Sequence, residues 1–120
     1  MTQVLSAERQ QSFDDFYQGA MQKDAGRIRA VLTDDFTFRG PLASFDNPDD
    51  FVASLLAVDA TVTGSRVIAQ DSRAAHLFVL KMTAPFQAAI PMCDILEFDG
   101  NRIRGIELYA DSKNFQPSER

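Results

Sequence analysis

The 120-residue sequence has no tryptophan, one cysteine and one histidine. A single cysteine cannot form an intramolecular disulfide, and a single histidine argues against a metal site built from several histidines. The chain has 12 Lys and Arg residues against 17 Asp and Glu, which gives a net charge of −5, and the basic residues are scattered. Because nucleic acid binding needs clustered Lys and Arg, we expect no nucleic acid partner.

Long apolar runs and cofactor-binding motifs are also missing. No segment approaches the ~20 apolar residues needed to cross a bilayer, and the first ten residues lack the basic and apolar regions of a signal peptide. The sequence contains no P-loop, dinucleotide-binding glycine motif, zinc-protease motif or nucleophile elbow. We therefore expect a cytoplasmic protein with no membrane contact, no metal and no cofactor.

The composition predicts one globular domain. Ten phenylalanines and a hydrophobic fraction of 45% are enough for a single core in a chain of this length. The domain is expected to span residues 1–120, with its core at about 6–115 and a polar tail at 116–120.

Helical spacing dominates the first half of the chain. Ser6 is expected to cap a first helix, and Asp24 a short second helix that runs through Leu32 and ends at Asp34–Asp35. Asn47–Pro48 predicts the start of a third helix, with Asn as the cap and Pro in the first turn. The apolar stripe of the first helix consists of Phe13, Phe16, Tyr17, Ala20 and Met21.

The second half of the chain is typical of strands. Four long strands are expected at 61–70, 75–83, 88–98 and 102–110, after a short strand at Phe36–Phe38 and a short return strand at 42–45. The Asp99–Gly100 turn between the last two long strands is the strongest short-range hairpin signal in the sequence. Helices followed by an antiparallel meander predict an α+β fold.

One carboxylate interrupts the apolar pattern of the strand at 88–98. Alternation places Asp94 on the same strand face as Met92, Leu96 and Phe98. A charged group there is costly unless it is paired, hydrated or protonated. Two interpretations stay open: a carboxyl group with a raised pKa at the bottom of a ligand pocket, or a structural carboxylate satisfied by a core partner or by solvent.

The order of these elements, together with three short segments, resembles a known superfamily. The segments are Leu32–Phe38, Ile95–Ile103 and Leu108–Asp111. They are similar to the cystatin-like α+β cone of the nuclear transport factor 2-like superfamily, and within it to the SnoaL-like and ketosteroid-isomerase-like branch. The resemblance implies three N-terminal helices packed on a curved, mainly antiparallel sheet.

The resemblance also implies site residues, although only in part. In ketosteroid isomerases a strand carboxylic acid, kept protonated by apolar surroundings, donates a hydrogen bond to the substrate oxyanion. Asp94 matches that position. The helix tyrosine of that family aligns with Phe16, next to Tyr17, and its general-base aspartate aligns with Gly40. The family's isomerase set is therefore incomplete in this sequence.

Two other branches of the superfamily match still less completely. Asp111 corresponds to the last-strand aspartate of limonene-epoxide-hydrolase-like members, but the segment 79–83 offers no matching Arg and Asp. SnoaL-like polyketide cyclases use a pocket aspartate with a histidine nearby, for which Asp94 or Asp111 with His76 are the candidates. Ordinary roles remain open for these side chains, with His76 at the rim of the sheet and Asp111 solvated.

We therefore expect a cofactor-independent isomerase, cyclase or hydrolase that acts on a small apolar carbonyl or cyclic compound, or a non-catalytic module that binds such a molecule. The candidate catalytic residues are Asp94, His76 and Asp111. The candidate ligand-binding residues are Phe16, Tyr17, Phe38, Phe78, Met82, Met92, Leu96 and Tyr109, of which the two tyrosines also fit plain core packing.

The expected partners are the small apolar molecule and a second copy of the chain. Leu77, Val79, Cys93 and Ile95 form an apolar stripe on the other face of the long strands, and no helix remains in the sequence to cover it. Since large exposed apolar patches are rare on monomers, we expect a homodimer through this sheet face, as the superfamily commonly forms.

Overall fold

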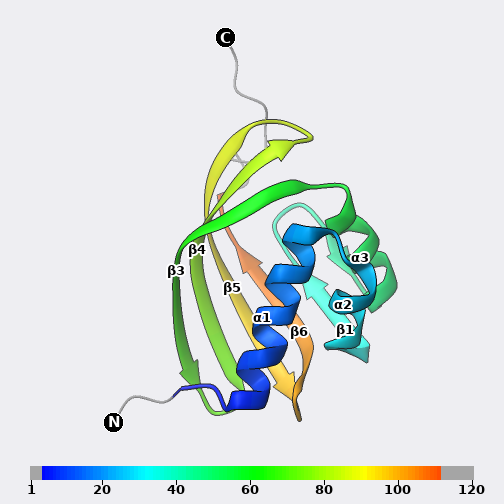
Figure 1. Ribbon diagram of the computed structural model, residues 1–120, viewed down its shortest axis with the longest axis vertical. Coiled ribbons are helices and arrows are strands. Elements are labelled where there is room, and N and C mark those ends of the chain that lie inside the picture. Colours follow the sequence, from blue (N-terminus) through cyan, green and yellow to red (C-terminus); the bar gives the residue numbers. More distant parts are fainter. Residues whose placement is uncertain (1–3, 112–120) are drawn as a thin grey trace.

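The computed structural model describes residues 4–111 and consists of three helices and one six-stranded sheet (Figure 1). The elements are α1 (Ala7–Gln22), α2 (Ala25–Ala30), β1 (Leu32–Arg39), β2 (Ser44–Phe45), α3 (Pro48–Leu56), β3 (Asp59–Gln70), β4 (Arg73–Ala84), β5 (Ala88–Asp99) and β6 (Arg102–Tyr109). The predicted α+β class is confirmed. The predicted polar tail at 116–120 lies outside the described residues.

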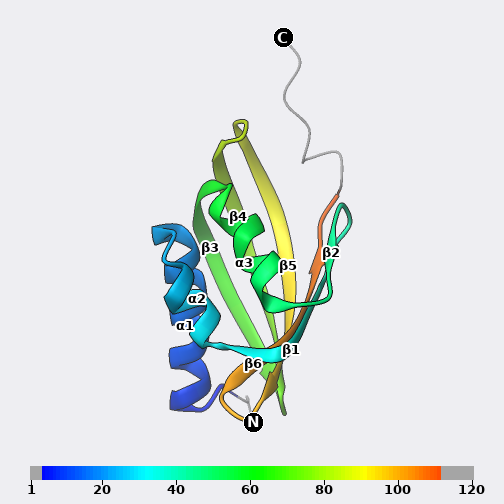
Figure 2. The same ribbon diagram turned by 90° about the vertical axis from the view of Figure 1, so that its right-hand side faces the viewer.

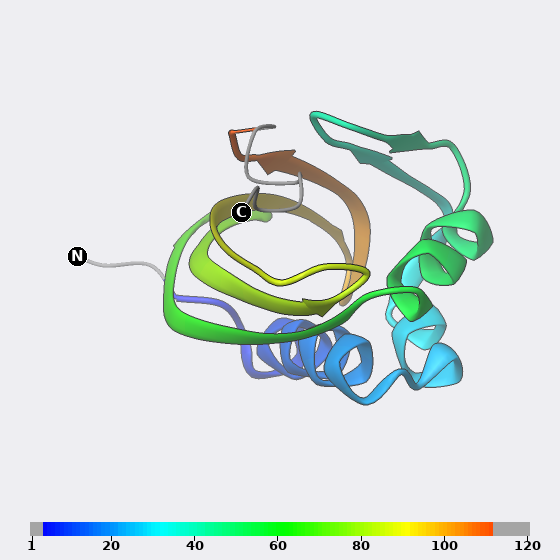
Figure 3. The ribbon, with the colours of Figure 1, turned by 90° about the horizontal axis from the view of Figure 1, so that it is seen from above.

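The sheet is mixed, with strand order β2-β1-β6-β5-β4-β3. Strand β1 runs parallel to β6, and the other neighbouring strands are antiparallel. Seen from above, β3 to β6 follow a curved path, with α1 beside them and with α2 and α3 next to β1 (Figure 3). The side view shows α1 and α2 on one side of the curved sheet (Figure 2). The helices thus leave the opposite sheet face without a helical cover among residues 4–111.

All three helices begin where the sequence predicts. The side chains of Ser6, Asp24 and Asn47 accept hydrogen bonds from backbone amides in the first turns of α1, α2 and α3, which satisfies donors that have no partner within the helix. Pro48 occupies the first turn of α3.

The predicted end of the second helix is wrong. Helix α2 stops at Ala30, and Leu32 already pairs with Ile103 as the first residue of β1. The backbone amide of Ile103 donates a 2.8 Å hydrogen bond to the carbonyl of Val31. From this residue on, the backbone is hydrogen-bonded to β6 instead of forming another helical turn. Asp34 and Asp35 therefore lie within a strand. The helical spacing of apolar residues at 28–32 did not show where the helix ends, because Leu32 is buried equally well as the first residue of a strand.

The four long strands are confirmed with ends within two residues of the prediction. Gly100 adopts a positive φ of 60° in the turn between β5 and β6, as the hairpin signal requires. The predicted strand at Phe36–Phe38 is part of the longer β1, and only Ser44–Phe45 of the segment 42–45 forms the return strand β2.

The core lies between the helices and the concave face of the sheet. The phenylalanines at 13, 16, 36, 38, 51, 78 and 98 are buried there with aliphatic residues from every long strand except β3. No helix within residues 4–111 has both the length and the apolar character needed to cross a membrane.

Candidate functional site

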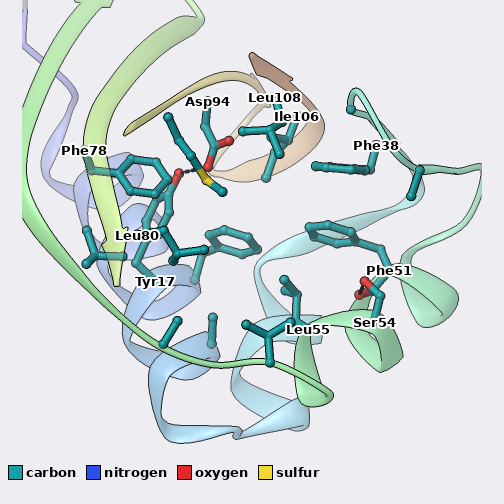
Figure 4. Close-up of a pocket in the computed structure, with 18 of the residues that line it drawn as sticks. Tyr17, Phe38, Phe51, Ser54, Leu55, Phe78, Leu80, Asp94, Ile106 and Leu108 are labelled. Atoms are coloured by element: carbon teal, nitrogen blue, oxygen red, sulfur yellow. Dashed lines mark hydrogen bonds between the residues drawn. The ribbon is translucent and has the colours of Figure 1, made fainter. Parts of the chain in front are cut away.

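An apolar cavity of about 320 Å³ lies inside the fold, between the helices and the concave sheet face (Figure 4). Its lining residues are Phe16, Tyr17, Ala20, Met21, Phe38, Gly40, Pro41, Leu42, Ala43, Phe45, Phe51, Ser54, Leu55, Val58, Ala60, Val62, Phe78, Leu80, Met92, Asp94, Ile106 and Leu108. Within residues 4–111, the only oxygen-bearing side chains in this lining belong to Tyr17, Ser54 and Asp94, and no Lys, Arg or His contributes to it. The cavity is therefore suited to a small, mostly apolar molecule with few polar groups.

Asp94 and Tyr17 form a hydrogen-bonded pair at one end of this cavity. The hydroxyl group of Tyr17, on α1, donates to Oδ2 of Asp94, on β5, over 2.7 Å. Both side chains are buried, with Asp94 only 8% exposed. The pair joins the helical layer to the sheet and places two of the three polar side chains of the described lining next to each other.

Burial dominates the ionisation of this pair. Desolvation raises the pKa of Asp94 from 3.8 to about 7, although the hydrogen bond from Tyr17 acts in the opposite direction. Burial and the neighbouring Asp94 carboxyl raise the pKa of Tyr17 well above its usual value of 10. Near pH 7, Asp94 thus exists both as a carboxylic acid that can donate a proton and as a carboxylate that can accept one.

The third polar side chain is already occupied. The hydroxyl of Ser54, on α3, donates a 2.6 Å hydrogen bond to the backbone carbonyl of Phe51. Figure 4 shows Ser54 across the cavity from Asp94. Ser54 can therefore accept a hydrogen bond from a ligand but has no free proton to offer, so the acidic chemistry of the cavity is concentrated at Asp94 and Tyr17.

Phenylalanine rings form the other end of the cavity around Phe51. Its ring stacks on Phe38 with centroids 4.7 Å apart and lies parallel to Phe16 at 6.1 Å. A Cβ atom added at Gly40 would lie 2.9 Å from the ring of Phe38. The ring thus fills the space into which any side chain at position 40, the position aligned with the family's general base, would extend.

His76 lies next to the cavity rather than in its lining. It is 1% exposed, and its ring stacks on Phe78 with centroids 4.4 Å apart and contacts Tyr17 edge to face. Its Nε2 atom is hydrogen-bonded to Oγ of Ser65, whereas Nδ1 is buried without a partner. Burial lowers the pKa of His76 from 6.5 to about 4, so the imidazole is neutral at pH 7. The interpretation of His76 as a rim residue is therefore wrong.

Six of the predicted site residues come together in the cavity lining: Phe16, Tyr17, Phe38, Phe78, Met92 and Asp94. Tyr17, rather than Phe16, is the residue of α1 whose side chain contacts Asp94, so the position suggested by the resemblance was one residue off. Met82 and Leu96 are on the same faces of their strands but are buried in the core outside the lining.

Two predicted residues lie away from the cavity. Tyr109 is 58% exposed and donates its hydroxyl proton to Glu107. It pairs with Cys93 across β5 and β6, and since Cys93 faces outward, so does Tyr109. Asp111 is exposed beyond the end of β6 and does not line the cavity. The assignment of Tyr109 to the ligand pocket is therefore wrong.

Sequence reasoning missed much of the lining. Phe51 and Leu55 have the spacing of four that places residues on one helix face, and Leu80 shares the alternation of Phe78, so these three carried a signal of burial but none of a cavity. The segment 40–43 and the start of β3 carried no such signal, because their place in the lining depends on how the sheet curves. Ser65 was also missed.

The SnoaL-like domain family model matches residues 13–106 of the chain, which covers the cavity residues of α1, α3 and all the strands except the end of β6. No curated protein matches the sequence.

Solved structures with the same fold include proteins described with three different activities. A candidate ketosteroid isomerase from Kribbella flavida DSM 17836 superposes with a TM-score of 0.74 and 13% identity, covering 94% of this chain and 82% of its own. An LEH-like epoxide hydrolase from M. tuberculosis has a TM-score of 0.72 and 16% identity over 91% of this chain and 86% of its own. A candidate polyketide cyclase from Xanthomonas campestris pv. campestris has a TM-score of 0.77 and 13% identity over 90% of this chain and 93% of its own.

Further similar structures are described as NTF2-like and as having a cystatin-like fold. The predicted fold family is thus confirmed. At these identities the likeness concerns the fold and leaves the reaction to the residues of the cavity.

Proposed function

The chain belongs to the SnoaL-like domain family, and we propose that it acts on a small apolar molecule bearing a carbonyl or similar oxygen, with Asp94 as the acid of the pocket. The reaction class is a cofactor-independent isomerisation, cyclisation or hydrolysis, in keeping with the descriptions of the similar structures. The observation that carries the proposal is the Asp94–Tyr17 pair at one end of an apolar cavity.

The chemistry of this pair favours a ligand oxygen. Protonated Asp94 donates a hydrogen bond or a proton to a carbonyl or ring oxygen, and the Tyr17 hydroxyl is close enough to supply a second donor. Donors fixed in a low-dielectric site stabilise developing negative charge far better than they would in water. The pair is therefore suited to stabilise an enolate or alkoxide that forms at the buried end of the cavity.

The apolar remainder of the cavity sets the size and polarity of the molecule. A volume of about 320 Å³ is at the lower end of the range of roughly 300–1,000 Å³ for small-molecule sites. Phe38 and Phe51 offer flat surfaces at the other end, which favour a planar or cyclic body. A ligand with a ring system and one oxygen fits both ends.

A second candidate function is non-catalytic binding of the same kind of molecule. Among the described residues that line the cavity, Asp94 is the only side chain that titrates near neutral pH. Proton transfer between two sites on a substrate usually needs a second acid or base. The family's base position is Gly40, and the ring of Phe38 fills the adjoining space. This incomplete set favours a binding module.

A single probe separates the two functions. Prodan, a neutral fluorescent aromatic ketone, reports binding by a blue shift of its emission and reports catalysis by exchange of its α-hydrogens in D₂O, measured by proton NMR. We expect binding to the native protein and loss of binding in Val62→Trp, which fills the cavity. Asp94→Asn can still donate a hydrogen bond but cannot transfer a proton.

The outcomes differ for each function. Exchange with the native protein that disappears in Asp94→Asn supports an enzyme that forms an enolate, and binding without exchange excludes enolate formation and favours the binding module. Gln18→Ala, at an exposed position of α1 outside the cavity lining, serves as the control and is expected to behave as the native protein. Absence of prodan binding to the native protein would contradict both functions.

A further inference from the structure

Three polar side chains lie side by side across three neighbouring strands: Ser65 on β3, His76 on β4 and Asp94 on β5. His76 and Asp94 are directly opposite each other in the antiparallel register of β4 and β5. Directly opposite residues on one sheet face have Cβ atoms roughly 4.5–5.5 Å apart. Ser65 contacts the other side of the imidazole through Nε2. His76 thus lies between an exposed serine and the buried acid of the cavity.

A β-bulge directs Ser65 at the imidazole. Two residues of β3, Gly64 and Ser65, oppose the single residue Phe78, because the register shifts between Thr63 and Arg66. Gly64 has a φ of 65°, the backbone conformation of a glycine bulge. Bulges of this kind re-aim a side chain, and here the shift turns the hydroxyl of Ser65 towards His76.

The imidazole carries a hydrogen-bonding atom that nothing in the described conformation uses. His76 is 99% buried and its Nδ1 has no partner. The contacts of the ring with Phe13, Tyr17 and Phe78 are aromatic contacts that a phenylalanine would make equally well. An unsatisfied buried nitrogen is costly, so a hydrogen bond from Nδ1 to a group within its reach would be stabilising.

Asp94 is the group that gains from such a partner. From the elements packed against it, Asp94 faces Tyr17 on α1, His76 on β4 and the apolar Leu108 on β6. The Tyr17 hydroxyl can donate one hydrogen bond, and in the structure Asp94 accepts it. When the Tyr17 hydroxyl instead donates to a ligand oxygen, the carboxylate that Asp94 becomes after giving up its own proton has no donor.

We propose that His76 is a positioning residue for Asp94: in the tautomer with hydrogen on Nδ1, Nε2 accepts from the Ser65 hydroxyl, and Nδ1–H holds the Asp94 carboxylate whenever the Tyr17 hydroxyl turns to a ligand. Desolvation keeps the imidazole neutral at pH 7, which is the form that this tautomer requires. The inference rests on the proposed role of Asp94 in the cavity. It adds that Asp94 accepts a hydrogen bond either from Tyr17 on α1 or from His76 on β4.

A double-mutant cycle on the full chain tests this alternation without any ligand. Tyr17→Phe imitates the loss of the Tyr17 hydroxyl to a ligand, and His76→Phe removes both nitrogens but keeps the ring. The readout is the pKa of Asp94, from the infrared titration of its carboxyl C=O stretch, assigned with Asp94→Asn.

We expect His76→Phe to leave the pKa of Asp94 nearly unchanged in the native background, where Tyr17 still donates. In the Tyr17→Phe background, we expect the same change to raise this pKa by at least about one unit, a tenfold change in the ionisation equilibrium, because the carboxylate then has no donor. Ser65→Ala, at an exposed position, should raise the pKa of Asp94 in the same background by less, because it removes only the hydrogen bond to Nε2 and leaves the imidazole in place.

Phe13→Leu is the matched control, because Phe13 contacts the imidazole without a polar group and should leave the pKa of Asp94 unchanged in both backgrounds. Circular dichroism identifies any variant that does not fold. If His76→Phe does not fold, Ser65→Ala in the Tyr17→Phe background still tests the proposal. Equal effects of His76→Phe in both backgrounds would overturn the proposal. A lowered pKa in the Tyr17→Phe background would also overturn it, because His76 would then be accepting from the acid.

The cycle and the prodan experiment fail independently. A coupled cycle without prodan binding leaves the pairing of His76 and Asp94 intact and contradicts the proposed function. Prodan binding together with an uncoupled cycle supports the proposed function and contradicts the pairing of His76 and Asp94.

Discussion

The hydroxyl of Tyr17 donates a 2.7 Å hydrogen bond to Oδ2 of Asp94, across 77 positions of the sequence. This bond is the polar contact between α1 and the concave sheet face at the end of the cavity. Burial raises the pKa of both groups, the Asp94 carboxyl raises that of Tyr17 further, and the hydrogen bond from Tyr17 lowers that of Asp94. The properties of the site therefore depend on the packing of α1 against β5 as much as on the residues themselves.

Asp94 and His76 should affect the pH dependence of stability in opposite directions. Folding raises the pKa of Asp94 from 3.8 to about 7, so between these values the folded protein keeps a proton that the unfolded chain releases, and the free energy of unfolding falls as pH rises. Folding lowers the pKa of His76 from 6.5 to about 4, so in that interval the unfolded chain binds the extra proton and the free energy of unfolding rises with pH. We expect the two contributions to oppose each other between pH 4 and 6.5.

Single variants separate these contributions. Asp94→Asn leaves the His76 contribution, and we expect its free energy of unfolding to rise from pH 4.5 to 6.5 more steeply than that of the native protein. His76→Phe leaves the Asp94 contribution, and its free energy of unfolding should fall over the same range relative to the native protein. Each difference should reach about 2 kcal/mol across these two pH units, since one proton per pH unit is worth about 1.4 kcal/mol. Urea denaturation at a series of pH values measures it, and three parallel pH profiles would contradict the prediction.

Gly40→Ala should destabilise the fold and narrow the cavity. The new methyl group would lie 2.9 Å from the Phe38 ring, which cannot retreat because it stacks on Phe51. Overpacking of this kind costs typically about 1–3 kcal/mol. Thermal and urea denaturation measure the loss of stability, and prodan titration measures the expected fall in affinity.

Two further variants show whether the contact with Phe38 is the cause. Gly26→Ala, in α2, meets no atom closer than 3.8 Å and should leave the stability unchanged or slightly increase it. Gly40→Ala combined with Phe38→Leu should lose less stability than the sum of the two single changes, because the smaller side chain makes room. Additive losses would show that the ring is not what excludes a side chain at position 40.

The uncovered face of the sheet should form a homodimer. Leu77 pairs with Cys93 across β4 and β5. The next row on the same face contains Ile95 on β5 and Ile68 on β3, and Ile68 is 66% exposed. Together they form a continuous apolar surface that a second copy of the chain would bury. Light scattering at micromolar concentration should give twice the chain mass of 13.3 kDa.

Leu77→Lys should convert this dimer to a monomer, because it places a charge at the centre of the surface. Leu42→Lys is the control, since Leu42 is 63% exposed at the cavity and away from the outer sheet face. A native protein with the mass of one chain would refute the dimer. Dissociation by Leu42→Lys as well would show that another surface is involved.

The site could be predicted from sequence only as far as alternation and helical spacing reach. Asp94, Phe78 and Met92 were placed on the cavity face by the period of two within their own strands. Tyr109 was misplaced because its orientation depends on its register with Cys93, which the sequence of β6 alone does not define. Ser65 was missed because a bulge at Gly64 reverses the alternation of β3 at that point.

Interactions between residues close together in the sequence determined most of the fold. Capping side chains at 6, 24 and 47 begin the helices, and the Asp99–Gly100 turn joins the last two strands. The family resemblance and the presence of one carboxyl group among apolar neighbours follow from the sequence as well. These features depend on residues within a few positions of each other, which is why a pattern can indicate them.

Only the tertiary structure decided what Asp94 contacts. The choice of Tyr17 over Phe16, the burial of His76 opposite Asp94 and the ring of Phe38 beside Gly40 all depend on how α1 and the curved sheet pack together. A one-residue rotation of α1 would exchange Tyr17 for Phe16 and leave the carboxyl without its donor. Contacts between distant segments set the desolvation and the hydrogen bonds of a buried group, and these set its pKa and its chemistry.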